Sequence, residues 1–120
     1  MVIVETLTRT ENIGKLTYLY RYNLIEGYIL MEHDGEKQSM KSYGIEVERV
    51  DIRNGKPVNV KSELIENISP NREKVYKLLN MLHQHAVSPI HLVDVIGEYV
   101  DESVGDFDLK LEQSQNVYLI

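Results

Sequence analysis

The 120-residue sequence contains no cysteine, a single alanine and no long hydrophobic run. The absence of cysteine excludes disulfide frameworks, thiolate nucleophiles and zinc sites of the Cys-x-x-Cys kind. No stretch is long enough to span a bilayer, and the start of the chain, Met1 to Glu5, has no basic lead-in of the signal-peptide kind. We therefore expect a cytoplasmic protein that has no membrane partner and is stabilised by packing.

The net charge of −6 is concentrated at one end of the chain. Residues 1–93 contain 12 acidic side chains and 12 lysines and arginines, so they balance. Residues 94–120 contain the other seven acids against Lys110 alone, and this excess accounts for the whole net charge. The last quarter of the chain is therefore an acidic pole.

The first half of the sequence alternates apolar and polar residues with a period of two, which indicates antiparallel strands. Turn residues stand at Glu11 to Gly14 and at His33 to Glu36, and each predicts a turn between strands. The Asn54-Gly55 pair tolerates positive φ at both central positions of a tight turn, so it predicts a β-hairpin. Pro57 makes the strand that follows an edge strand, because proline cannot donate to a ladder. The expected strands, about five in number, lie around residues 2–5, 16–22, 28–31, 43–52 and 58–60.

The second half changes to a helical period. Ser69-Pro70 and Ser88-Pro89 each place a side-chain oxygen at an N-cap and a proline at the first helical position. A helix is expected from each start, and the short connection between them predicts a helical hairpin. The apolar face of the first is formed by Val75, Leu78, Leu79 and Leu82, and that of the second by Leu92, Val93, Ile96 and Val100.

Strands followed by helices predict an α+β fold. Residues 1–102 are expected to form one domain, an antiparallel meander of about five strands followed by a two-helix hairpin packed on one face. Residues 103–120 are expected to be an acidic C-terminal tail, either loose or docked as an extra strand.

Three segments, Tyr43 to Glu48, Ile68 to Pro70 and Ser88 to Asp101, resemble a family of small uncharacterised proteins from clostridia and related spore-forming Firmicutes. The resemblance covers most of the chain except the acidic tail. It implies a bacterial cytoplasmic setting, and it carries over no functional residues because the family has no assigned activity.

Three histidines, His83, His85 and His91, lie close together in the sequence. Since His91 shares a helical face with Asp94, a small metal-dependent enzyme using His83, His91 and Asp94 is one hypothesis. However, His83 and His85 point to different sides of a helix, and no ligand pair stands at i, i+4 as in His-Glu-x-x-His. We expect no bound metal or other cofactor, and we assign these histidines to helix ends.

Tyr18, Tyr20 and Tyr22 form an aromatic stripe of the kind on which nucleic-acid bases stack. Nucleic-acid affinity depends mostly on neutralising phosphates, and this chain has no excess of positive charge. We therefore predict that the tyrosine rings cover the core beneath the helices and that the protein binds no nucleic acid directly.

The favoured hypothesis is a small regulatory or adaptor protein, rather than an enzyme, that binds a partner protein with a basic surface. One expected contact is the edge strand with Val58 and Val60, which could pair with a partner or with a second copy to form a homodimer. A further hypothesis is an acidic inhibitor that mimics nucleic acid. In the favoured hypothesis, the contact residues expected besides the edge strand are acidic: Asp94, Glu98, Asp101, Glu102, Asp106 and Asp108.

Overall fold

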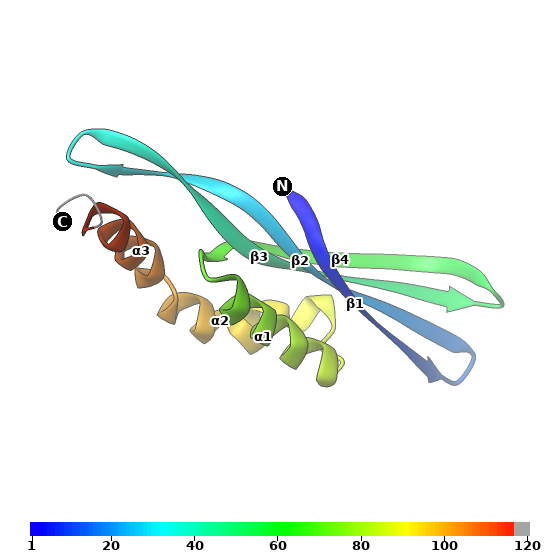
Figure 1. The fold of residues 1–120 in the computed structure, drawn as a ribbon. Helices are drawn as coiled ribbons and strands as arrows, with labels where there is room; N and C mark the ends of the chain where they lie inside the picture. The colour runs from blue at the N-terminus through cyan, green and yellow to red at the C-terminus, as the bar shows by residue number, and fades with distance from the viewer. Residues whose placement is uncertain (117–120) are drawn as a thin grey trace.

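The computed structural model describes the backbone of residues 1–116 and the side chains of residues 1–113. The molecule is elongated, with principal extents of 63 × 22 × 19 Å. A long antiparallel sheet forms one layer, and helices lie along one side of it (Figure 1). The α+β class expected from the sequence is confirmed.

The sheet has four strands: β1 (Val2–Ile13), β2 (Leu16–His33), β3 (Glu36–Arg53) and β4 (Lys56–Ser69). They are antiparallel neighbours in chain order, as a meander requires. The expected count of about five strands is wrong, because the segments on either side of Gly27 belong to one strand. Gly27 pairs with Ser42 of β3, so the ladder runs through the position that the sequence suggested as a break.

The three hairpin turns lie where the turn residues predicted them. Gly14, Gly35 and Gly55 all have positive φ, and Asn54 also does, at 52°. A left-handed conformation at both central positions is what a tight hairpin with the strand twist demands, and Asn-Gly adopts it at little cost.

Among the described residues, four helical segments follow the sheet: α1 (Arg72–Gln84), the short η1 (Pro89–His91), α2 (Leu92–Glu102) and α3 (Gly105–Asn116). The chain turns back after α1, and α2 and α3 run along the sheet in the opposite direction (Figure 1). The expected N-cap of the first helix at Ser69 is wrong. Asn71 caps α1 instead, by accepting a hydrogen bond of 3.1 Å from the backbone N–H of Lys74.

The main core lies between the middle of the sheet and the helices. The tyrosine stripe faces the helices as predicted: Tyr20 and Tyr22 are buried, and the Tyr22 hydroxyl donates to the carbonyl of Val87 at 2.9 Å. Burying these rings and the aliphatic side chains beneath the helices removes apolar surface from water, which is the main stabilising term. The other fully buried members of this core are Leu24, Ile45, Val47, Ile68, Val75, Leu79, Leu82, Leu92 and Ile96.

The far end of the β2–β3 hairpin, residues 28–41, projects beyond β1 and β4 and is called the β2–β3 arm below. Phe107 and Leu111 of α3 pack there against Met40, with Ile29 and Met31 beside them. The expectation of a loose tail or an extra strand is therefore wrong for Gly105–Asn116, which is a docked helix. The expectation for residues 117–120 lies outside the described part of the chain.

The set of β2 side chains that faces the helices changes from even-numbered residues in the main core to odd-numbered residues in the arm. Tyr22 and Leu24 face the main core, whereas Ile29 and Met31, at positions of the other parity, face α3. A two-stranded ribbon twists more strongly than a wider sheet. We attribute the change to this twist, which turns the opposite face of the arm toward the helices (Figure 1).

Candidate interaction surfaces

The outer side of α2 presents a row of carboxylates. Leu92 and Ile96 are fully buried, so the helix has a fixed orientation on the sheet. Residues at i, i+4 and i+7 share a helix face, which places Asp94, Glu98 and Asp101 together on the side away from the core. These three and the adjacent Glu102 are called the acidic face below, and all four are exposed.

The acidic face is uncompensated by nearby cations. Among the described side chains, none of its four carboxylates forms an ion pair within 4.0 Å. By contrast, acids elsewhere do have partners, such as Glu5 with Arg72 and Asp51 with Arg49. Within the described residues, no ion pair therefore neutralises these carboxylates, so their charge can attract an approaching cationic group.

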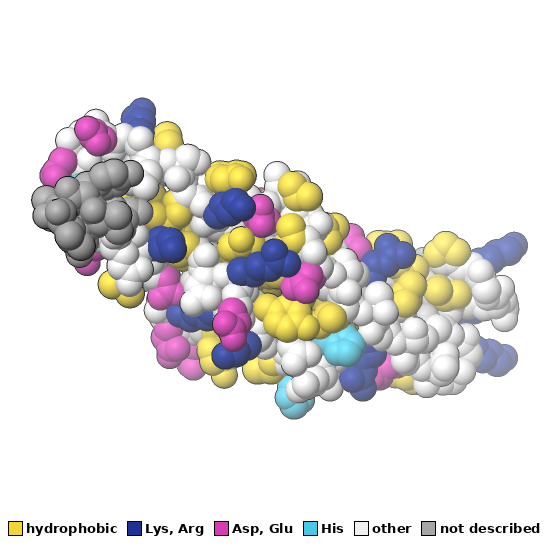
Figure 2. Space-filling view, in the orientation of Figure 1, with side chains coloured by type: hydrophobic (Ala, Val, Ile, Leu, Met, Phe, Trp, Pro, Cys, Tyr) yellow, Lys and Arg dark blue, Asp and Glu magenta, His cyan; other side chains and the backbone are white. Residues whose placement is uncertain are grey.

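Apolar side chains border the acidic face. Val93, Val95 and Tyr99 of α2 are 56%, 38% and 45% exposed. On a helical wheel Val93 lies on one flank of the acidic face, and Val95 and Tyr99 lie on the other. The surface of α2 therefore combines charge with apolar contact area. Figure 2 shows acidic side chains toward the α2 and α3 end, and lysines and arginines both among the helices and at the ends of the β1–β2 and β3–β4 hairpins.

Asp106, which the sequence grouped with the acidic contact residues, is engaged inside the molecule. Its Oδ2 atom lies 2.7 Å from Lys74 Nζ and accepts a hydrogen bond of 2.7 Å from Ser69 Oγ. Burial alone would raise the pKa of Asp106, but the hydrogen bonds from Lys74 and Ser69 outweigh it and lower the pKa. Asp106 therefore fastens the start of α3 to α1 and β4, whereas Asp108 is exposed.

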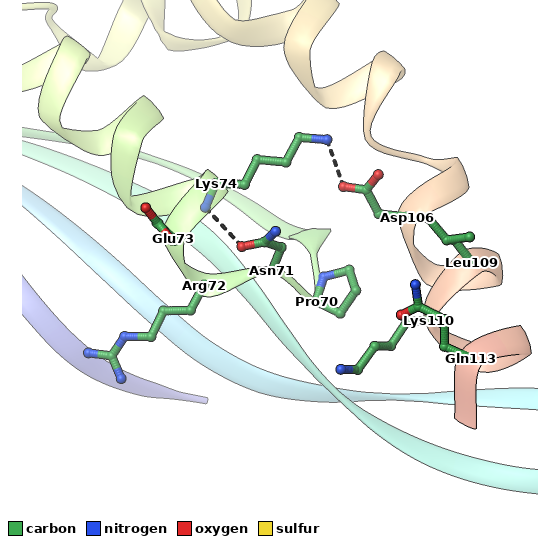
Figure 3. Close-up of a pocket in the computed structure, with 9 residues that line it drawn as sticks. All are labelled: Pro70, Asn71, Arg72, Glu73, Lys74, Asp106, Leu109, Lys110 and Gln113. Atoms are coloured by element: carbon green, nitrogen blue, oxygen red, sulfur yellow. Dashed lines mark hydrogen bonds and ion pairs between the residues drawn. The ribbon is translucent and has the colours of Figure 1, made fainter. Parts of the chain in front are cut away.

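A half-open cavity of about 520 Å³ lies beside this ion pair, between the start of α1 and α3 (Figure 3). Lys74 points across it to Asp106, and the Asn71 cap forms part of its wall. The lining carries three cations, Arg72, Lys74 and Lys110, and two acids, Glu73 and Asp106, so charges of both signs border the cavity. The described residues that line it are Pro70, Asn71, Arg72, Glu73, Lys74, Asp106, Leu109, Lys110 and Gln113.

The histidines named as metal candidates are not brought together. His83 Nε2 lies 2.8 Å from the carbonyl oxygen of Thr8, and its ring packs edge-on against Tyr22 at 5.8 Å between centroids. His85 caps the carboxyl end of α1, and His91 stands at the end of η1, both exposed. Within the part of the chain that the structure describes, no three His, Asp or Glu side chains converge on a metal position.

The two edges of the sheet differ in cover. At β1, His83 contacts the backbone of Thr8, and Arg9 donates to the carbonyls of His83 and Gln84 at 3.2 and 3.1 Å. At β4, every residue from Lys56 to Glu63 is exposed, and Val58 and Val60 are 57% and 64% exposed. The edge strand expected after Asn54-Gly55 is thus present and uncovered along most of its length.

The side of the sheet away from the helices carries a polar row that sequence reasoning missed. Thr6 donates to the Asn23 side chain at 2.8 Å, and Asn23 donates to Glu46 at 3.0 Å. These residues lie side by side on β1, β2 and β3. The sequence does not reveal the strand register, and only the pairing of the strands shows that these polar positions are neighbours.

An antiparallel four-stranded meander with helices along one side defines the class of this protein as an α+β single-sheet fold. Residues 1–102 match a protein family described as a family of unknown function (DUF6514), and the chain belongs to that family. No curated protein and no solved structure matches the chain. No helix in the described residues is long and apolar enough to cross a membrane.

Proposed function

We propose that this protein is a regulatory or adaptor module that binds a basic segment of another protein on the acidic face of α2. The observation that carries the proposal is the alignment of Asp94, Glu98 and Asp101 on one exposed helix face without a cation to pair with them in the described structure. A stable fold does not need this arrangement, because none of these side chains contributes to the core.

Charge and apolar area have different roles in this proposal. The carboxylates attract a basic partner over a distance of about one Debye length, roughly 8 Å at physiological salt, and thereby raise the association rate. Exposed Val95 and Tyr99 supply contact area that is removed from water in the complex. Tyrosine is among the side chains that most often dominate binding energy.

The acidic face also favours a protein partner over a nucleic acid. Phosphates would approach uncompensated carboxylates, which costs electrostatic energy. The tyrosines that could have stacked with bases are directed into the core, where Tyr20 and Tyr22 are 6% and 0% exposed.

The test compares two variants of equal charge. Neutralising the face with Asp94→Asn, Glu98→Gln and Asp101→Asn should weaken capture of the partner from cell extract at least tenfold. The control neutralises three acids at the tip of the β2–β3 arm, with Glu32→Gln, Asp34→Asn and Glu36→Gln, and should leave capture unchanged. A purified partner should also dissociate as salt is raised.

Two outcomes would redirect the proposal. Capture that responds neither to salt nor to the triple substitution would remove the acidic face as the docking surface. A partner that itself binds DNA or RNA, and releases it in competition with this protein, would instead identify the acidic face as a mimic of nucleic acid.

A further inference from the structure

The uncovered part of β4 has a charge pattern that is complementary to itself. Lys61 and Glu63 stand two residues apart on the edge, with Ser62 between them, and all three are exposed. Within the described residues, neither Lys61 nor Glu63 forms an ion pair. Lys61 is the only charged residue between Pro57 and Glu63.

An unpaired strand edge is a template for another strand. The middle of the β1 edge is engaged by α1, since His83 contacts Thr8 and Arg9 ties the strand to the end of α1. The β4 edge has no such contact from Val58 to Glu63 in the described structure. Pairing with another copy would satisfy the backbone groups that this edge otherwise presents to water.

We propose that two copies of this chain pair through antiparallel β4 strands about a two-fold axis at Ser62, which joins two four-stranded sheets into one. In this register Lys61 of each copy lies opposite Glu63 of the other, so the ion pair forms twice. Val60 of each copy likewise lies opposite Leu64 of the other. This interface is independent of the acidic face of α2.

The strand faces agree with this register. Ile65 pairs with buried Ile45, so odd-numbered residues of this part of β4 point to the helix side and even-numbered ones to the open side. Lys61 and Glu63 are both odd, whereas Val60 and Leu64 are both even. Each pair therefore meets on one side of the joined sheet, as neighbouring strands require.

Neighbouring registers are disfavoured by charge. Centring the two-fold axis on residue 61 would place Lys61 opposite its own copy, and centring it on residue 63 would do the same for Glu63. Like charges directly opposite each other destabilise a strand pair. A slip by one residue would turn every side chain to the wrong face.

The helices do not obstruct this pairing. Those that pack near β4 lie toward its carboxyl end, where Ile68 and Ser69 are buried. In the proposed register, the part of β4 that follows Ile65 in one copy lies beside the end of β4 near the β3–β4 turn in the other. The helical layers of the two copies therefore lie at opposite ends of the shared strand pair.

Charge reversal tests the register with its own control. The full chain should sediment as a dimer, and either Lys61→Glu or Glu63→Lys should raise the dimer dissociation constant at least tenfold. The double variant, K61E with E63K, should restore the dimer because it exchanges the two charges. Mixing the two single variants should give a heterodimer in which all four charges are paired.

Circular dichroism of each variant establishes that the sheet remains folded, and Lys15→Glu, a reversal at the β1–β2 turn, should leave the dimer unchanged. A wild-type chain that stays monomeric at the highest attainable concentration would overturn the proposal. So would single variants that dimerise as tightly as wild type, or a double variant that does not recover.

Discussion

The main core and the β2–β3 arm use the same kinds of side chain but differ in how many elements they join. The main core collects buried residues from β2, β3, β4, α1 and α2. The arm has a cluster of three buried residues, Met40 of β3 with Phe107 and Leu111 of α3, against which the partly buried Ile29 and Met31 of β2 pack. Stability should therefore be uneven along the molecule, with the arm and α3 opening before the core.

The largest effect is expected at the centre of the main core. Leu79→Ala removes a fully buried side chain of α1, and the surrounding residues can close the cavity only in part. We expect a loss of about 3 kcal/mol in the free energy of unfolding, measured by urea denaturation. The whole chain should respond as one transition, and Leu109→Ala, at an exposed position of α3, serves as the control.

A smaller and more local effect is expected in the arm. Phe107→Ala removes the main apolar contact between α3 and Met40. Because α3 can detach while the main core stays folded, we expect amide hydrogens of α3 to lose protection and those of α1 to keep it. Hydrogen exchange with mass spectrometry measures both helices in one experiment. Equal loss of protection in α1 would show that the two regions unfold together.

The smallest effect concerns the ion pair that fastens α3. Asp106→Asn should cost about 1 kcal/mol, because the pair with Lys74 is partly exposed. The lowered pKa of Asp106 sets the sign of the pH dependence: the stabilisation is complete above the usual value of 3.8. It is lost as the pH falls through the lower, folded-state pKa. Exchange in α3 should therefore rise in acid, and the variant should lack this contribution.

The candidate surfaces were predictable to different degrees. The carboxylates of α2 could be placed on one helix face from their spacing alone, and Pro57 identified β4 as an edge strand. No sequence signal showed that Asp106 would form an ion pair with Lys74 and accept a hydrogen bond from Ser69, since these partners lie 32 and 37 residues away. The same holds for His83, whose contact with Thr8 spans 75 residues.

The close approach of two backbones at Gly44 could not be predicted from the presence of a glycine alone. In the sequence it reads as one more isolated glycine in an alternating segment. In the structure β4 bulges against it, and a Cβ atom there would collide with the carbonyl oxygen of Ile65. The closeness of two backbones depends on the bulge in the partner strand, so it has no local signature.

The sequence by itself determined the three hairpin turns, the apolar face of α1 and the concentration of acid near the end of the chain. It also determined the apolar face of α2 except at Val93, which was expected on that face and is 56% exposed. Positive φ, helical period and charge are properties of neighbouring residues, so they can be read locally. The tertiary structure alone decided that β2 continues through Gly27, that the arm turns its other face to α3 and that β4 is left uncovered. These features arise from strand twist and from contacts between residues far apart in the chain, whose energies are fixed only when the elements meet.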